Sequence, residues 1–213
     1  MNPHEEMNTI IHDALRRDLD RLEVALRQPL PEDRRTALCG HVDWMLDVLH
    51  HHHAGEDEGV WPRVLAKRPD LQPMVAEMES EHEALAAASD GLRAATAVYA
   101  RDGSERNRLD MAAAVEQMKQ ATLPHLEHEE REAMPLVLAT LDEADWTYLE
   151  KNHFRKGMSL GNTGLYGMWI MDDLDQRRQA AVRATIPGPV FWFLRRRYGP
   201  RYRRTTELVW GTT

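Results

Sequence analysis

The sequence of 213 residues contains one cysteine, Cys39. A single cysteine cannot form a disulfide within the chain, and it excludes a metal site built mainly from thiolates. No apolar run approaches the roughly 18 residues that a membrane-spanning helix needs. The first residues, MNPHEEMNTIIHD, have neither the basic nor the apolar region of a secretory signal, so we expect a cytoplasmic protein.

Several patterns with established chemistry are also missing from the chain. It has no glycine-rich phosphate loop, no nucleophile elbow and no zinc-finger spacing. Strand-like alternation of apolar and polar residues is absent from the first 140 residues. These absences indicate a helical framework. They also mean that any chemistry must come from residues outside these known motifs.

The formal net charge of −8 is unevenly distributed. Residues 151–213 carry 12 Lys and Arg against 4 Asp and Glu, whereas residues 1–150 carry 15 against 31. The chain therefore consists of an acidic body with a net charge of −16 and a basic, aromatic tail with a net charge of +8. We expect residues 1–140 to form one domain and residues 141–213 to form a helical extension that packs on it.

Four segments have the apolar spacing of three and four residues that is typical of amphipathic helices, at about residues 5–27, 31–67, 71–101 and 105–136. Asp102 and Gly103 end the third segment, and Ser104 can cap the fourth. Short connections favour antiparallel neighbours, so the pattern predicts an all-α fold, an up-and-down antiparallel four-helix bundle. In the tail we expect helices at 142–152 and 165–183, a loop at 161–164 and a break at 186–189.

One motif occurs twice: His-x-x-x-Glu, with a proline six residues after the glutamate. A lone histidine precedes each copy by about forty residues. The members are His12, His52, Glu56 and Pro62 in the first copy, and His82, His125, Glu129 and Pro135 in the second. We expect both motif-bearing helices to end at matched depths beyond their motifs.

The histidines and glutamates of this repeat fall on the helix stripes that should face the core. Burying unpaired carboxylates and imidazoles is costly, and a pair of divalent metal ions would satisfy them together. Residues i and i+4 share one helix face, so each His-x-x-x-Glu can offer nitrogen and oxygen to one centre. Ligation by imidazole and carboxylate favours iron, then manganese or zinc. The predicted metal ligands are His12, His52, Glu56, His82, His125 and Glu129.

Neighbouring residues offer alternatives to this ligand set. Asp57 and Glu130 lie next to the predicted carboxylates and are possible substitutes. His50, His51 and His53 lack the combined stripe position and Glu/Pro spacing, so we expect them around the site or on the surface.

The repeat resembles the pattern of the hemerythrin-like family, also called HHE cation-binding domains, over about residues 5–140. The resemblance implies a four-helix bundle around two non-haem iron ions with an oxo or hydroxo bridge. It assigns His12 to the first helix, His52 and Glu56 to the second, His82 to the third, and His125 and Glu129 to the fourth.

The chain departs from the oxygen-carrying hemerythrins at two positions. They have a second histidine four residues after the third-helix ligand, where this chain has Ala86, and their fourth-helix carboxylate comes one residue later than Glu129. A seventh ligand would be water, a tail residue (Tyr148, His153 or Tyr166) or absent. The more open and more anionic site favours turnover over reversible oxygen carriage.

These patterns lead to one main functional hypothesis and two alternatives. The main one is a cytoplasmic di-iron protein that binds or turns over O₂, NO or H₂O₂, with an electron donor if it is an oxidoreductase. The first alternative is an iron or oxygen sensor or binding protein that signals through the extension. The second is a ferritin-like oxidase that uses Glu79-x-x-His82 and Glu150-x-x-His153, which leaves both His-x-x-x-Glu motifs unexplained.

The basic tail has three interpretations. We expect it to fold back on the acidic body and to bury its aromatic residues there. An interfacial helix is a second interpretation, because residues 191–194 are apolar and precede three arginines. A nucleic-acid platform of Trp192, Tyr198 and Tyr202 is a third, and we do not expect a nucleic-acid partner.

Overall fold

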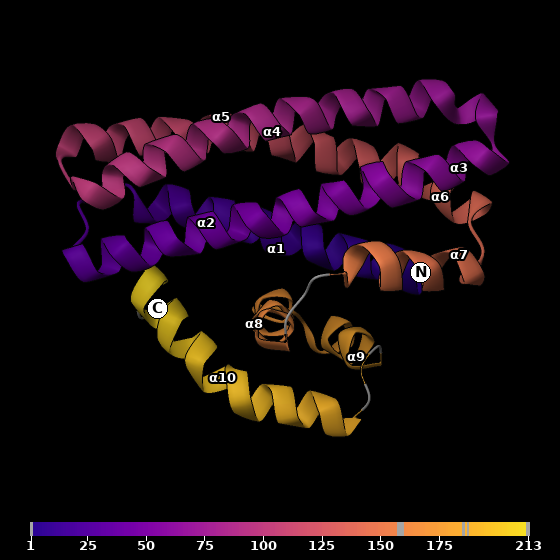
Figure 1. The fold of residues 1–213 in the computed structure, drawn as a ribbon. Coiled ribbons are helices and arrows are strands. Elements are labelled where there is room, and N and C mark those ends of the chain that lie inside the picture. Colours follow the sequence, from indigo (N-terminus) through magenta and orange to yellow (C-terminus); the bar gives the residue numbers. More distant parts are fainter. Residues whose placement is uncertain (1, 157–159, 185, 187, 212–213) are drawn as a thin grey trace. The chain divides into compact units, whose positions relative to one another are not determined.

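The computed structural model describes residues 2–156, 160–184, 186 and 188–211, and all regular structure within these ranges is helical. The predicted all-α helical bundle is therefore confirmed. No helix in the described ranges is long and apolar enough to span a membrane. The elements follow one another as shown in Figure 1: α1 (Pro3–Ala25), α2 (Glu32–Gly55), η1 (Glu56–Val60), α3 (Trp61–Lys67), η2 (Pro69–Leu71), α4 (Gln72–Arg101), α5 (Glu105–His128), η3 (Glu129–Ala133), α6 (Met134–Thr140), α7 (Glu143–Leu149), η4 (Glu150–Phe154), α8 (Leu160–Ile170), α9 (Gln176–Ala184) and α10 (Gly188–Trp210).

The chain forms two compact units. The first, here called the bundle unit, comprises residues 22–156, and the second, the terminal unit, comprises residues 1–21 and 157–213. The boundaries of these compact units differ from those of the expected domains, 1–140 and 141–213. The division into those domains stays a prediction.

Three long helical rods make up most of the bundle unit: α2–η1–α3, α4 and α5–η3–α6 (Figure 1). Helix α4 packs against both α2 and α5, and the chain reverses direction before and after it. The Ser104 hydroxyl accepts a hydrogen bond from the Asn107 backbone N–H at 3.4 Å, which confirms the predicted cap of the fourth long helix. The short reversals make neighbouring rods antiparallel, as the sequence predicts.

A π-helical turn interrupts each motif-bearing rod at its glutamate. The Trp61 N–H binds the Glu56 carbonyl, and the Met134 N–H binds the Glu129 carbonyl, so both hydrogen bonds span five residues. Pro62 and Pro135 follow directly, and a proline ring would press on the carbonyl four residues earlier in an unbroken α-helix. The wider π turn accommodates each proline, so the repeated prolines mark π turns and do not end the helices.

Both rods then continue for one short helix. Helix α3 ends at Lys67 and α6 ends at Thr140, the same number of residues beyond the two motif glutamates. The expected matched depth is therefore confirmed. Trp146 and Leu149 of α7 join the core at this end of the bundle unit, together with residues of α3, α4 and α6: Val64, Val75, Met78, Met134 and Val137.

The terminal unit corrects two expectations about the tail. Residues 161–164 lie within α8 and not in a loop. A Cβ atom on Gly164 would lie 2.2 Å from the Tyr198 ring, so this glycine permits α8 and α10 to approach closely. The helix expected at 165–183 is divided into α8 and α9 by a turn that includes Asp173, whose φ is 61°. Pro187, part of the expected break, lies outside the described residues.

Candidate metal centre

Six of the buried polar side chains in the three rods of the bundle unit are the histidines and glutamates at and beside the repeated motif. They are His52, His53 and Glu56 at the α2–η1 junction, His82 in α4, and His125 and Glu129 at the α5–η3 junction. None is more than 7 % exposed. Burying so many polar groups in a helical core needs a compensating partner, since each carboxylate or imidazole without one destabilises the fold by several kcal/mol.

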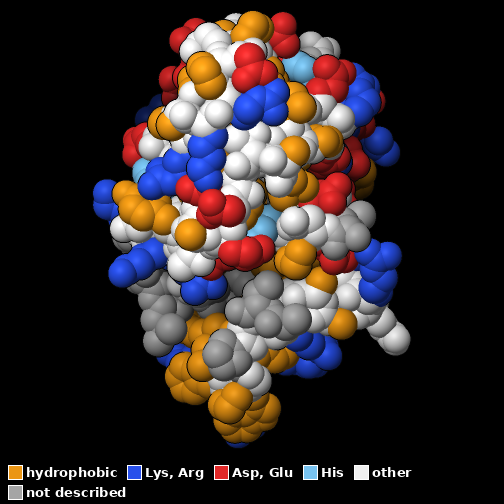
Figure 2. All heavy atoms as spheres, turned by 90° about the vertical axis from the view of Figure 1, so that its right-hand side faces the viewer, with side chains coloured by type: hydrophobic (Ala, Val, Ile, Leu, Met, Phe, Trp, Pro, Cys, Tyr) orange, Lys and Arg blue, Asp and Glu red, His pale blue; other side chains and the backbone are white. Residues whose placement is uncertain are grey.

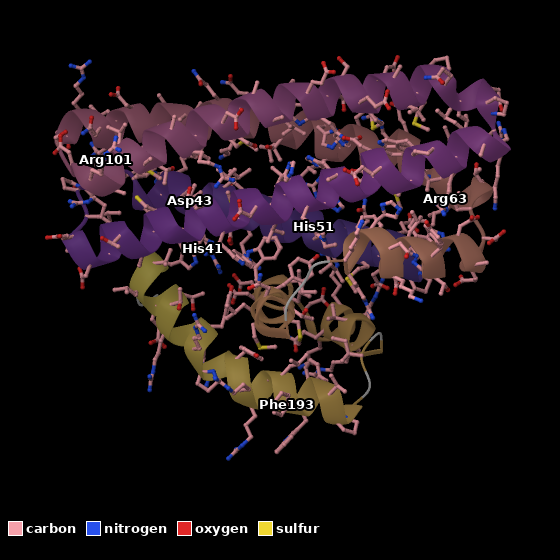
Figure 3. All side chains as sticks on the ribbon, in the orientation of Figure 1. His41, Asp43, His51, Arg63, Arg101 and Phe193 are labelled. Carbon is pink, nitrogen blue, oxygen red and sulfur yellow. The ribbon has the colours of Figure 1, made fainter. Side chains whose placement is uncertain are left out.

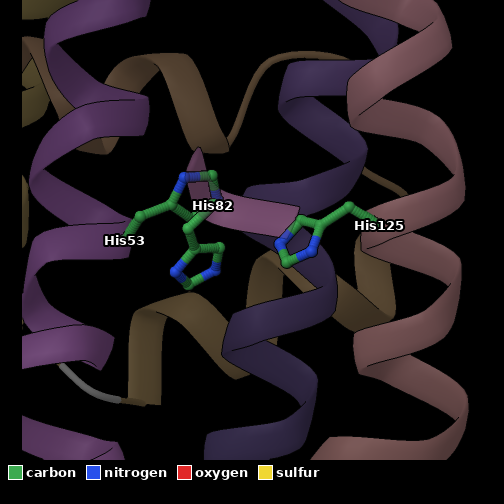
Figure 4. Close-up of side chains that lie close together, drawn as sticks. All are labelled: His53, His82 and His125. Atoms are coloured by element: carbon green, nitrogen blue, oxygen red, sulfur yellow. The ribbon is translucent and has the colours of Figure 1, made fainter. Parts of the chain in front are cut away.

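Three of these histidines bring their rings together, one from each rod (Figure 4). The His53 and His82 rings stack with their centroids 4.2 Å apart, and the His125 ring lies edge-on at 5.1 Å from His53 and 4.8 Å from His82. One ring nitrogen of each lies within 4.8 Å of the others, which is close enough for all three to bind one metal ion. Imidazole nitrogen suits iron, zinc and copper.

The two motif glutamates lie beside these histidines. Glu56 places one oxygen 3.3 Å from His52 Nε2 and the other 3.6 Å from His82 Nε2. An oxygen of Glu129 lies 3.8 Å from His125 Nε2. Burial, and then repulsion from Glu129, raise the pKa of Glu56 well above its ordinary value. A cation between the two carboxylates would reverse this effect, because an opposite charge favours the ionised form.

Carboxylates outside the cluster orient two of the imidazoles. His82 Nδ1 lies 2.7 Å from Asp57 Oδ1, and His125 Nδ1 lies 2.8 Å from Glu81 Oε2. An ionised carboxylate can only accept, so each Nδ1–H donates and each Nε2 keeps its lone pair. A carboxylate on the outer nitrogen is the usual support of a metal-binding histidine. Burial also lowers the pKa of His125, which favours the neutral ring that a metal requires.

The inner atoms of this cluster have the properties of metal ligands. Within the described ranges, His82 Nε2, His125 Nε2 and Glu56 Oε2 are buried and have no hydrogen-bond partner. Buried polar atoms are nearly always hydrogen-bonded, so three such atoms in one cluster indicate a missing partner. A metal ion would accept the lone pairs of all three, and the residues therefore fit a bound cation.

Most of the predicted ligand set is found together. His52, Glu56, His82, His125 and Glu129 all belong to the cluster in the bundle unit. His12 is buried in the part of α1 that belongs to the terminal unit, and it stays a predicted ligand.

His53, expected around the site or on the surface, has its ring buried against His82 and His125, which makes it a further candidate ligand. Its neighbours lie outside the cluster: His50 is exposed, and His51 Nε2 is hydrogen-bonded to the Phe154 carbonyl at 2.8 Å. The position where the oxygen carriers have an additional histidine, Ala86, is exposed. His53 is therefore a candidate for a further imidazole ligand, from a different helix.

The other residues considered as alternative ligands lie in different surroundings. Asp57 binds the outer nitrogen of His82 and also accepts from Trp61 Nε1 at 3.1 Å, so it supports a ligand and does not replace Glu56. Glu130 is half-buried. Of the tail residues considered as a seventh ligand, Tyr148 is exposed and Tyr166 belongs to the terminal unit.

Glu81 is a residue of the candidate site that the sequence pattern did not reveal. One of its oxygens binds His125 Nδ1, and the other lies 2.7 Å from His128 Nδ1. The spacing His125-x-x-His128 places both rings on one side of α5, which is a signal for a shared partner. The partner is Glu81 of α4, one residue before His82. This could not be predicted from the sequence, because it depends on how α4 and α5 pack together.

The segment α7–η4 packs directly on the ligand-bearing helix. A Cβ atom on Gly55 would lie 2.5 Å from the Phe154 ring, and one on Gly59 would lie 2.9 Å from the His153 ring. These glycines flank Glu56 and give η4 its close approach. The first part of the tail therefore covers the α2–η1 junction, and His153 rests on Gly59.

Buried imidazoles and carboxylates, oriented by outer carboxylates between packed helices, define a cation-binding helical protein. The chain belongs to the family described as hemerythrin HHE cation binding domain, whose pattern matches residues 9–138. The predicted resemblance is thereby confirmed, and binding of a cation, typically iron, follows from it. No curated protein and no solved structure matches the chain.

Replacing Glu81 with glutamine is expected to weaken iron binding about 10–100-fold, the usual effect of losing an outer partner of a metal-binding histidine. Glutamine has one accepting oxygen, so it cannot serve His125 and His128 together. Competition with a chelator would measure the affinity. Glu83→Gln, an exposed change on the same helix, is the control. An unchanged affinity, or equal weakening in both variants, would contradict the role of Glu81.

Proposed function

We propose that this protein is a non-haem di-iron protein that binds or turns over a small molecule: O₂, NO or H₂O₂. The main support is the cluster of buried, inward-facing atoms without hydrogen-bond partners: His82 Nε2, His125 Nε2 and Glu56 Oε2. Family membership supports iron as the cation. Iron supplies a change of oxidation state and an affinity for small diatomic molecules.

The proposal gives each residue of the cluster a role. His53, His82 and His125 hold one iron, and His52 holds the other, with His12 added from the sequence pattern alone. Glu56 and Glu129 lie between the histidine groups and balance the metal charge. Asp57 and Glu81 keep Nδ1 protonated, so that the Nε2 lone pairs of His82 and His125 face inward. The apolar core beside the cluster excludes bulk water.

Elemental analysis tests this proposal. The full chain, produced with iron, manganese and zinc all present, is expected to contain about two iron atoms, one for each histidine group. Addition of NO, O₂ or H₂O₂ to the reduced protein should then change its absorption spectrum. One zinc per chain, or no metal, would contradict the di-iron proposal, and full iron without any spectral response would contradict the small-molecule part.

A second candidate function is an iron or oxygen sensor. The contact of η4 with Gly55 and Gly59 favours it, because a change at Glu56 would act directly on the covering segment. Hydrogen exchange of residues 143–156 should then slow when iron binds. Equal exchange with and without iron would contradict this function. The ferritin-like alternative gains no support, since Glu79 and Glu150 are both exposed.

A further inference from the structure

Helix α10 carries a concentration of basic charge without acidic partners. It contains six arginines and one acidic residue, Glu207. The arginines are all exposed, and none forms an ion pair with another described residue: Arg195, Arg196, Arg197, Arg201, Arg203 and Arg204. A helix surface of this kind attracts polyanions.

The start of the same helix exposes large apolar side chains. Val190, Trp192 and Phe193 are 45 %, 65 % and 48 % exposed, and Trp192 is the most exposed large hydrophobic residue of the described chain. Figure 3 shows Phe193 pointing away from the neighbouring ribbons, and Figure 2 shows a patch where hydrophobic side chains gather at the surface. Exposed aromatic residues side by side indicate a binding surface.

The apolar and basic parts of α10 are adjacent along the helix. The arginines begin two residues after Phe193, and the Arg196 guanidinium lies over the Trp192 ring at 5.8 Å. Tryptophan prefers the boundary between lipid tails and headgroups, and arginine extends from there to the phosphates. An apolar tip with arginines behind it therefore matches an anionic bilayer surface in both polarity and charge.

The remaining aromatic residues of α10 do not favour nucleic acid. Single-stranded nucleic acid stacks its bases on exposed rings between basic residues. Tyr198 is buried against Gly164, and the Tyr202 hydroxyl donates to Asp172 at 3.2 Å. Two of the three rings that could form a stacking platform are thus engaged within the terminal unit.

We propose that α10 binds anionic phospholipid membranes peripherally, with Val190, Trp192 and Phe193 inserted among the lipids and the arginines on the headgroup phosphates. Basic residues near an anionic surface each contribute to binding, and the effect declines with salt. This surface is independent of the metal cluster, so the proposal holds whether or not the chain carries iron.

Sedimentation of the full chain with vesicles tests the proposal. We expect binding to phosphatidylcholine vesicles that contain phosphatidylglycerol, little binding to phosphatidylcholine alone, and loss of binding in high salt. Replacing Arg195, Arg196 and Arg197 with glutamine should weaken binding about a hundredfold. Trp192→Ala with Phe193→Ala should weaken it about tenfold or more. Leu109→Ala, at an exposed apolar position of α5, is the matched control and should leave binding unchanged.

Several results would overturn the proposal. Absence of vesicle binding by the unaltered chain would do so without any variant, as would equal binding to neutral vesicles. Binding of a mixed-sequence single-stranded oligonucleotide, without binding of vesicles, would assign α10 to nucleic acid. Concentration-dependent dimerisation that the Trp192 and Phe193 changes abolish, without vesicle binding, would assign the tip to a second copy. Circular dichroism of each variant confirms that the helices are retained.

Discussion

Alanine in place of His53 is expected to reduce the iron content by about one atom per chain, because only His82 and His125 would then remain in the three-histidine group. The His53 ring stacks on His82 and contacts the edge of His125, so its loss removes a nitrogen from the centre of that group. Elemental analysis of the purified variant gives the measurement directly.

The adjacent sequence provides a matched control for this change. His50 lies in the same run of four histidines and is exposed, so His50→Ala should retain all the iron of the unaltered chain. His82→Ala should lose about one iron, as His53→Ala does, since both belong to the same group. Full iron in the His53 variant would show that His53 only packs against the ligands.

Glutamine in place of Glu56 is expected to have opposite effects on metal binding and on stability. Iron binding should be lost, because an amide lacks the negative charge that a carboxylate ligand would supply. The metal-free protein should become more stable at neutral pH. Burial and repulsion from Glu129 raise the pKa of Glu56, so the carboxyl costs stability there, and an amide carries no charge to desolvate.

Urea unfolding of the metal-free proteins measures the second effect, and elemental analysis measures the first. The control is Glu58→Gln, since Glu58 lies on the same π turn and is exposed. That variant should keep its iron and its stability. A Glu56 variant that lost both iron and stability would indicate that the carboxylate is a structural residue with satisfied hydrogen bonds.

The long helices could be predicted closely because their signals are local. Apolar spacing gives the body of each helix, and stop and cap residues such as Gly103 and Ser104 give the ends. The Asp142 side chain accepts from the backbone N–H groups of Ala144 and Asp145, at the start of the helix expected at 142–152. Such signals need no knowledge of the rest of the fold.

Two features depended on packing and could not be predicted in this way. The run Gly161-Asn162-Thr163-Gly164 has the composition of a loop, yet it is helical because Gly164 admits the Tyr198 ring. A single apolar stripe along the second helix includes His52 and leaves out His53. Adjacent residues are about 100° apart around a helix, and a buried face of that width accepts both His52 and His53.

The candidate ligands illustrate the same division. The repeat identified His52, Glu56, His82, His125 and Glu129, because buried polar groups at core positions stand out from an apolar pattern. The outer carboxylates did not stand out, since Asp57 and Glu81 are among many acidic residues of an acidic body. Only the distances to His82 and His125 distinguish them.

The two π turns at Glu56 and Glu129 fix the number of residues that each motif-bearing rod must contain. Each turn acts as one residue inserted into an α-helix, and removing a residue there would rotate everything downstream by about 100°. Val64 and Val137, both fully buried beyond the turns, would then swing toward solvent. The side chains of the cluster and the buried apolar residues beyond the turns therefore keep their orientations only if the π turns are retained. A one-residue deletion, harmless in most surface loops, would here expose the apolar core of the bundle unit beyond the turns.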